Sequence, residues 1–180
     1  MKKLPALLAA AVLVAACGGD NKSDETAATP TKTAAAQPTA TPTAAPAGKV
    51  KVTGALGAKP KVTITPINAT PPAKLVKKDL AKGHGKKAKA GDTVTVQYDG
   101  VLYQNGSEFD ASWDRGQPFS FPLGKGQVIP GWDKGVVGMK VGGRRQLIVP
   151  PDLGYGAQGQ PPTIQPNETL IFDIDLLKIG

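Results

Sequence analysis

Hydrophobic and polar residues alternate with a period of two along much of the chain from residue 49 onward. In the range 93–103, every second residue from Val94 to Tyr98 is apolar, and an Asn-Gly dipeptide that favours a turn follows at 105–106. This period predicts strands that bury one face. Further strand candidates cover residues 49–53, 61–65, 119–121, 144–150 and 169–179.

The last of these candidates shows the alternation most clearly. Every second residue from Leu170 to Leu176 is large and apolar, whereas Asp173 and Asp175 lie on the opposite face. We expect the apolar face to pack on a core and the acidic face to meet water. Sheets with one solvated face are typically antiparallel.

Helical periodicity is confined to the segment PGWDKGVVGM, residues 130–139. Trp132 and Val136, four residues apart, would share one face of a helix. Gly135 and Gly138 are poor helix formers, so we expect no more than two or three turns. One short helix against a curved antiparallel sheet predicts an α+β fold, with the sheet wrapped around the helix.

The first 17 residues have the composition of a secretory signal. Two lysines precede an apolar run from Leu4 to Ala16, which is too short to span a bilayer permanently. The letters VAAC, which end at Cys17, resemble the bacterial lipobox, in which the cysteine receives a lipid. The alternative is an ordinary secretory signal with a chance cysteine. Because Cys17 is the only cysteine in a chain directed to an oxidising compartment, we favour lipidation.

The composition changes abruptly after this segment. Residues 18–48 are dominated by Ala, Thr, Pro and Lys, and such a sequence buries too little apolar surface to fold. We expect a disordered linker there, an N-terminal extension or extra strand over 49–72, and the folded domain over 73–180. The protein should then be extracytoplasmic and lipid-anchored to a bacterial membrane.

The formal net charge is +8, and much of the excess lies in the segment 74–89. A surface that binds nucleic acid would interleave aromatic residues with this charge, and the segment has none. We therefore expect no nucleic-acid partner and favour a solvated basic face near anionic phospholipid.

The sequence lacks the residues that several kinds of catalytic and metal chemistry require. His84 is the only histidine and lies between two glycines in the basic segment, which argues against a Ser-His-Asp triad and against a zinc site. Neither the spacing of a phosphate-binding loop nor a clear catalytic pair of carboxylates is present. We expect no metal and no cofactor.

Aromatic and large aliphatic residues are instead concentrated in loops and at strand ends, where they would suit either a core or a concave apolar binding site. Taken alone, Phe121, Phe172 and Trp132 favour core filling, Tyr155 favours pocket lining, and Asp110 favours a turn cap. The full set is Tyr98, Phe109, Trp113, Phe119, Phe121, Val128, Ile129, Trp132, Tyr155 and Phe172.

Several motifs occur in a fixed order between residues 98 and 177: YDG, FD followed by DRGQPF, LGKGQVIPGWDKG, and YG ahead of TLIFDIDLL. With these motifs the chain resembles the FKBP-type peptidyl-prolyl cis-trans isomerases, the macrolide-binding immunophilins. The resemblance covers about residues 75–180. It implies a twisted antiparallel sheet around one short helix, with a hydrophobic pocket between them.

The resemblance also implies roles for individual residues. Trp132 would form the pocket floor under the substrate proline, the Tyr155 hydroxyl and the Ile129 N–H would bind the peptide, and Asp110 would form a polar wall with Arg115 and Tyr98. Catalytic roles would fall to Tyr98, Asp110, Ile129, Trp132 and Tyr155, and substrate-binding roles to Phe109, Arg115, Phe119, Val128, Ile164 and Phe172. Gln160 and Thr163 stand where the family commonly has a histidine and an apolar residue, which leaves the macrolide affinity open.

The implied activity is rotation about X-Pro bonds in extracytoplasmic proteins, without a cofactor, by a monomer that also binds macrolides. Two alternatives share the same pocket: a chaperone that holds proline-containing segments without turnover, and a membrane-anchored interaction protein. No second domain interrupts the segment between Phe121 and Tyr155, which argues against a dedicated chaperone.

Overall fold

The computed structural model describes residues 48–65 and 69–180. The predicted signal segment, Cys17 and all of the predicted linker except Gly48 lie outside these ranges. Within the described ranges, no helix is both long enough and apolar enough to cross a membrane.

The described residues form eight strands, one α-helix and one 3-10 turn. A two-stranded sheet precedes a six-stranded sheet, in which the order is β3-β7-β8-β4-β5 and β6 pairs with the first half of β4. Every pairing is antiparallel, which confirms the predicted α+β class. The bounds are β1 Lys49–Thr53, β2 Lys61–Thr65, β3 Val76–Ala81, β4 Thr93–Leu102, β5 Glu108–Ala111, β6 Phe119–Pro122, α1 Pro130–Gly135, β7 Arg144–Val149, η1 Pro151–Leu153 and β8 Leu170–Ile179.

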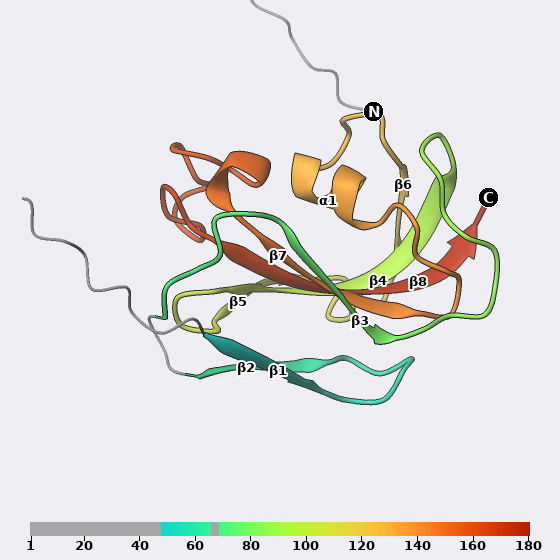
Figure 1. Cartoon of the computed structure of the whole chain (residues 1–180), viewed down its shortest axis with the longest axis horizontal. Helices are drawn as coiled ribbons and strands as arrows, with labels where there is room; N and C mark the ends of the chain where they lie inside the picture. The colour runs from blue at the N-terminus through green and yellow to red at the C-terminus, as the bar shows by residue number, and fades with distance from the viewer. Residues whose placement is uncertain (1–47, 66–68) are drawn as a thin grey trace, which may run out of the picture. The chain divides into compact units, whose positions relative to one another are not determined.

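The helix α1 packs on one face of the six-stranded sheet, as Figure 1 shows. It is shorter than the segment that the sequence pattern marked, and two glycines explain its place. A Cβ atom on Gly131 would come within 2.5 Å of Val149, and one on Gly135 within 2.4 Å of Leu147. These glycines weaken the helix but let it lie directly on β7.

The core between α1 and the sheet contains the apolar residues that the alternation selected. They come mainly from β4, β7 and β8, and the loop before β4, the loop before α1 and the residue after α1 add three more. The fully buried members are Ala88, Val94, Val96, Leu123, Val136, Leu147, Val149, Leu170, Ile174 and Leu176.

The opposite face of the sheet is covered around Asp173 and Asp175, so the expectation that these two residues meet water is wrong. Their exposed fractions are 1% and 4%. The hairpin formed by β1 and β2 covers part of this face (Figure 1), and it packs there through apolar side chains. The cluster contains Val50, Val62 and Ile64 from the hairpin, Val101, Ile148 and Ile171 from the sheet, and Tyr103, which directly follows β4.

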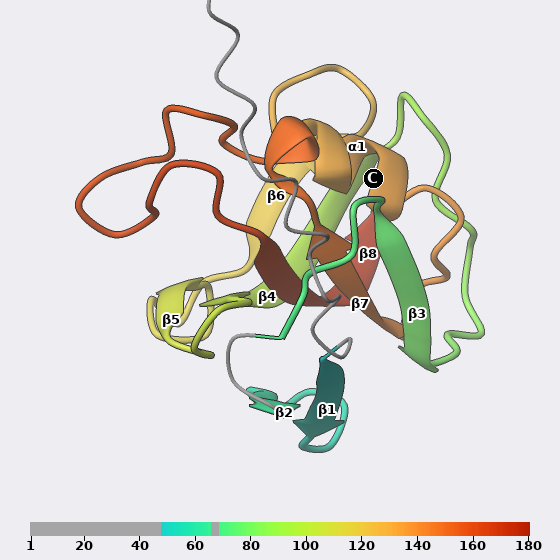
Figure 2. The ribbon, with the colours of Figure 1, turned by 60° about the vertical axis from the view of Figure 1, so that its left-hand side comes forward.

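The two edges of the six-stranded sheet differ in composition. Strand β3, with the sequence VKKDLA, lies at one edge, and the alternation did not predict it because charged residues occupy both of its faces. Strand β5 lies at the other edge (Figure 2) and has four residues. It pairs with β4 through a β-bulge between Gly100 and Val101.

Candidate active site

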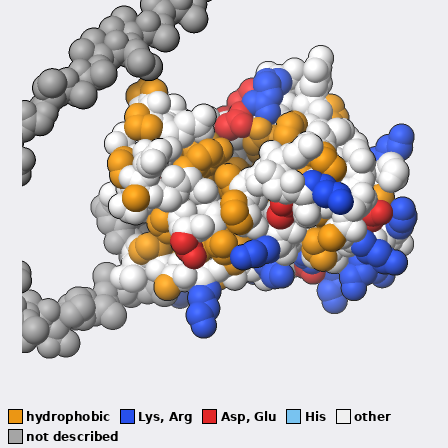
Figure 3. All heavy atoms as spheres, turned by 90° about the horizontal axis from the view of Figure 1, so that it is seen from above, with side chains coloured by type: hydrophobic (Ala, Val, Ile, Leu, Met, Phe, Trp, Pro, Cys, Tyr) orange, Lys and Arg blue, Asp and Glu red, His pale blue; other side chains and the backbone are white. Residues whose placement is uncertain are grey.

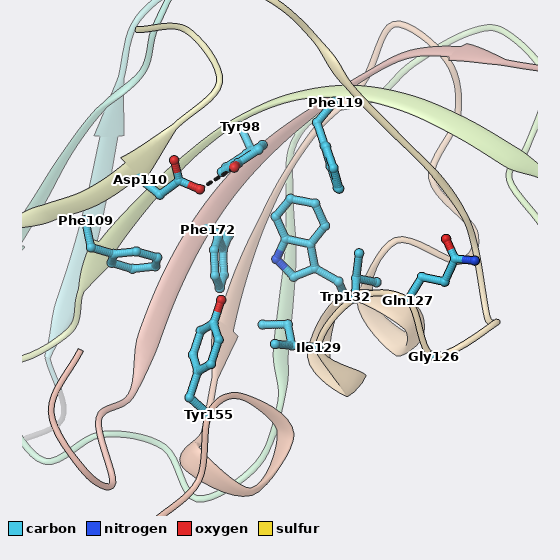
Figure 4. A pocket seen from close by; sticks show the side chains of 11 residues that line it. Tyr98, Phe109, Asp110, Phe119, Gly126, Gln127, Ile129, Trp132, Tyr155 and Phe172 are labelled. Carbon is cyan, nitrogen blue, oxygen red and sulfur yellow. Dashed lines mark hydrogen bonds between the residues drawn. The ribbon is translucent and has the colours of Figure 1, made fainter. Parts of the chain in front are cut away.

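A cavity of about 460 Å³ opens between α1 and the sheet, and Figure 4 shows the side chains that line it. Its walls come from β4, β5, β6, the loop before α1, α1 itself, the segment after η1 and β8. The lining residues are Tyr98, Phe109, Asp110, Phe119, Gly126, Gln127, Val128, Ile129, Trp132, Tyr155 and Phe172.

Trp132 belongs to both the core and the pocket. It is 4% exposed, and its ring meets Tyr98 and Phe172 edge to face at centroid distances of 5.0 and 5.2 Å. Phe119 and Phe121 lie within 6.3 and 5.5 Å of it. The choice between core filling and pocket lining is therefore not exclusive for this residue, because Trp132 belongs to the buried core cluster and also lines the cavity.

A hydrogen-bonded group forms one wall of the pocket. The Tyr98 hydroxyl donates to the Asp110 carboxylate, as the dashed line in Figure 4 marks, and Arg115 Nη1 donates to the same carboxylate. Arg115 Nη2 also donates to the Tyr98 hydroxyl over 2.6 Å, and the guanidinium lies 5.5 Å from the Tyr98 ring centroid. Asp110 is thus an ion-paired strand residue in β5 and not a turn cap.

The two tyrosines of the pocket are both protonated at neutral pH. Burial raises the pKa of Tyr98 to about 12, and the hydrogen bond to Asp110 adds to this effect. Burial, followed by the charge of Asp110, also raises the pKa of Tyr155. The hydroxyl of Tyr155 points into the pocket in Figure 4, so it is available as a hydrogen-bond donor.

Ile129 is the residue before α1, and its carbonyl accepts the Trp132 N–H over 2.9 Å. Among the described residues, the Ile129 N–H makes no hydrogen bond. The loop that carries it is tied to the helix, because the Asp133 carboxylate accepts the N–H groups of Gly124 and Gly126, each over 2.8 Å. The free N–H therefore stands on a braced loop at the pocket.

Two of the predicted site residues do not line this cavity. Arg115 reaches the wall only through Asp110 and Tyr98, and half of its side chain is exposed. Ile164 is buried, and it borders a neighbouring hollow of about 370 Å³ together with Gln160 and Thr163. In this flap, the backbones of Gln160 and Ile164 exchange hydrogen bonds of 2.8 and 3.0 Å. The two hollows share Phe109, Asp110 and Tyr155.

The structure adds Gly126 and Gln127 to the nine predicted residues that line the cavity. Both lie inside the motif LGKGQVIPGWDKG, but neither has an apolar side chain, so a search for apolar residues passed over them. Within the described ranges, no group of three His, Cys, Asp or Glu side chains could hold a metal ion.

Comparison with known proteins supports the family that the motifs indicated. The family described as FKBP-type peptidyl-prolyl cis-trans isomerase matches residues 84–177. A protein of Streptomyces anulatus named FK506-binding protein is 57% identical over 110 residues, which are 61% of this chain and 89% of that protein. A protein of the same name from Neisseria meningitidis serogroup A is 51% identical over 105 residues, or 58% of this chain and 95% of that protein.

Two solved structures show the same arrangement. The crystal structure of FkpA from Escherichia coli matches with a TM-score of 0.54 and 46% identity over 59% of this chain and 48% of that chain. The crystal structure of AtFKBP13 matches with a TM-score of 0.56 and 36% identity over 61% of this chain and 96% of that chain.

Together, the fold, the pocket and these matches define an enzyme that isomerises peptide bonds before proline. The chain belongs to the FKBP-type peptidyl-prolyl cis-trans isomerases. Strands β1, β2 and β3 lie outside the matched residues, so the hairpin β1–β2 is an addition to the part shared with the family.

Proposed function

We propose that the Trp132 pocket is the site at which this chain accelerates X-Pro rotation, and that its clients are proteins outside the cytoplasm. The observation that carries the first part is an apolar hollow with an indole along it, one ion-paired wall and hydrogen-bond donors from two sides. The second part rests on the N-terminal sequence.

The reaction depends on moving the amide from water into an apolar environment more than on a reacting side chain. Resonance gives the amide a rotation barrier of about 20 kcal/mol, and only before proline are the cis and trans forms close in energy. Rotation breaks conjugation, so the twisted amide is less polar than the planar one. An apolar cavity therefore favours the twisted state relative to water, which is differential binding of the transition state.

The donors of the pocket hold the chain on both sides of the proline. The Trp132 indole supports the pyrrolidine ring, while the Tyr155 hydroxyl and the Ile129 N–H each bind a substrate carbonyl. With both flanks held, thermal motion is directed into the X-Pro bond. The Asp110 carboxylate, which Arg115 and Tyr98 fix in place, stabilises the twisted amide electrostatically.

A protease-free isomerisation assay on a proline tetrapeptide tests this assignment. Tyr155→Phe should lower kcat/KM, whereas Tyr103→Phe is a matched control, because the Tyr103 hydroxyl bonds Thr70 O on the opposite side of the sheet. If the wild type, Tyr155→Phe and Trp132→Ala all gave only the uncatalysed rate, the result would instead support binding without turnover, or an interaction protein.

We further propose that Cys17 carries a lipid that anchors the enzyme outside the cytoplasm. The sequence before Cys17 supports this, and seven exposed lysines between Lys74 and Lys89 suit a nearby anionic surface. Figure 3 shows Lys and Arg side chains most densely on the right-hand flank, with others spread over the rest of this face. Inhibiting lipoprotein signal peptidase should make the precursor accumulate, and a precursor that is processed normally would contradict the anchor.

The pocket also suits a macrolide, because FK506 appears in the names of the similar proteins and a macrolide of that kind would fill the same apolar hollow. Exposed Gln160 and Thr163 in the flap would weaken the outer contacts without changing the floor. Competitive inhibition of the isomerase assay by FK506 would test this proposal, and Gln160→His should tighten the inhibition.

A further inference from the structure

The hairpin β1–β2 contacts the segment of the chain that forms the polar wall of the pocket. Lys59, just before β2, places its ammonium 2.8 Å from Glu108 Oε2 and 2.6 Å from Asp114 Oδ1. Glu108 begins β5, and Asp114 lies in the turn that follows this strand. One lysine from outside the family region therefore joins both ends of the segment 108–114.

This segment carries residues that the reaction uses. Phe109 and Asp110 lie between the two anchored acids, and Arg115 follows the second of them directly. Because the side chains of Asp110 and Arg115 pair with each other, a shift of the segment by a fraction of an ångström would move the whole polar wall. Catalysis by positioning is sensitive to shifts of this size.

The sheet alone holds this segment weakly. Strand β5 is an edge strand whose only neighbour in the sheet is β4, and the β-bulge interrupts its short ladder. Backbone pairing therefore leaves its outer side unsupported. Lys59 supplies a second attachment from the hairpin, which itself packs on the sheet through Val50, Val62 and Ile64.

The electrostatics agree with this arrangement. The hydrogen bond from Lys59 is the largest of the effects that lower the pKa of Asp114. Burial lowers the pKa of Lys59, but the hydrogen bonds to Asp114 and Glu108 outweigh it and the pKa is raised. Asp99 is buried nearby: burial and then Glu108 raise its pKa, and the charge of Lys59 opposes this rise.

We propose that Lys59 is a positioning residue of the active site, through which the hairpin β1–β2 holds the Phe109–Asp110 wall in its productive place. The proposal rests on the isomerase function assigned to the Trp132 pocket. It does not require Lys59 to touch the substrate.

The test compares kcat/KM and the thermal midpoint Tm in the full chain for Lys59→Ala, Lys59→Arg and Lys61→Ala. Lys61 is the matched control, since it is exposed on the same hairpin and makes no ion pair with the described residues. We expect Lys59→Ala to lower kcat/KM about threefold at low salt, Lys59→Arg to restore most of it, and Lys61→Ala to change nothing.

Two further measurements separate positioning from simple stabilisation. In a double-mutant cycle, Asp114→Asn should add little to the loss in Lys59→Ala, because both remove one interaction. High salt should lower kcat/KM of the wild type by a similar factor and affect Lys59→Ala less. If Lys59→Ala lowers Tm but leaves kcat/KM at the wild-type value, or if Arg does not restore activity, the proposal is wrong.

A Trp132→Ala variant, measured in parallel, distinguishes failure of the Lys59 proposal from failure of the isomerase function assigned to the Trp132 pocket. Loss of turnover in Trp132→Ala with normal turnover in Lys59→Ala would overturn only the positioning role. Should Lys59→Ala fail to fold, the salt response of the wild type alone decides, since a kcat/KM that is independent of salt would contradict the ion-paired anchor.

Discussion

The two faces of the six-stranded sheet are both covered, but by different means. On the pocket face, aromatic and aliphatic side chains pack under α1 and leave the Trp132 pocket open. On the hairpin face, charged residues are buried: Arg144 is 3% exposed, pairs with Asp175 through two nitrogens and donates to Gly54 O and Ala58 O in the hairpin turn. An apolar hollow leaves no polar group without a partner, whereas a buried charge requires every partner in place.

Because the two faces differ in this way, we expect one face to determine turnover and the other to determine stability. The pocket face lies within the residues matched by the family, and its hollow is the proposed substrate site. The hairpin face depends on an addition outside those residues. Substitutions on the first face should therefore change turnover most, and substitutions on the second should change the free energy of unfolding most.

Trp132→Ala should lower both turnover and the free energy of unfolding, and it has the largest expected effect. It removes the pocket floor, so kcat/KM should fall by at least about 100-fold, roughly 2.7 kcal/mol in the barrier. It also removes a buried aromatic ring from the core, which typically costs about 3–5 kcal/mol of unfolding free energy. Urea unfolding and the isomerase assay measure the two losses, and a variant that kept full turnover would contradict the assigned floor.

Arg144→Ala should lower stability without lowering turnover. It leaves Asp175 charged and buried and frees the two hairpin carbonyls, and breaking such a pair typically costs about 3–5 kcal/mol. Under conditions in which the variant is folded, kcat/KM per folded molecule should match the wild type. A large loss of turnover with unchanged unfolding would contradict the proposed separation of the two faces.

The hairpin face should also make stability depend on pH. Burial raises the pKa of Asp99 to about 7, with help from Glu108, and burial raises that of Asp173 to about 6. Both values lie above the usual value near 4. The folded state therefore holds these protons more tightly. Their stabilising contribution is full only below about pH 4, decreases as the pH rises, and is lost once the pH has passed through the folded pKa values of about 6 and 7.

Chemical unfolding between pH 5 and pH 8 measures this dependence. The free energy of unfolding should fall across the range in the wild type and fall less in Asp99→Asn, which cannot ionise. Asp79→Asn is the control, because Arg145 lowers the pKa of Asp79 and keeps its titration below this window. Equal slopes for the wild type and Asp99→Asn would contradict the assignment.

Tyr155→Phe should have the smallest effect of the four, and it should be confined to the pocket face. Loss of one hydrogen bond to the substrate is worth about 1.4 kcal/mol, or about tenfold in kcat/KM. The side chain is 37% exposed, so the free energy of unfolding should stay near the wild-type value. A stability loss as large as that of Arg144→Ala would show that Tyr155 is structural.

The pocket face could be predicted from the sequence because its signals are local. Alternation identified β4 and β8 almost to the residue, and the motif around Trp132 located the pocket. Asp110 was ambiguous when taken alone, since only the fold brings Arg115 and Tyr98 to it.

The hairpin face could not be predicted in the same way. Two aspartates on one side of a strand indicate solvent unless a distant segment covers them, and no local pattern reports that Arg144 in β7 pairs with Asp175. The alternation in 49–53 and 61–65 predicted strands but not the surface on which they pack. Strand β3 was missed because its charged residues hide a periodicity of two.

The Asp133 carboxylate, which accepts two N–H groups from the loop before α1, has a consequence for the speed of the catalytic cycle. Because this loop is already ordered in the free enzyme, binding a polypeptide costs little entropy for ordering the loop. The loop also does not have to open before the product leaves, so product release should not limit the rate of the catalytic cycle. An enzyme built this way can sample many prolines briefly, which suits clients that are themselves still folding.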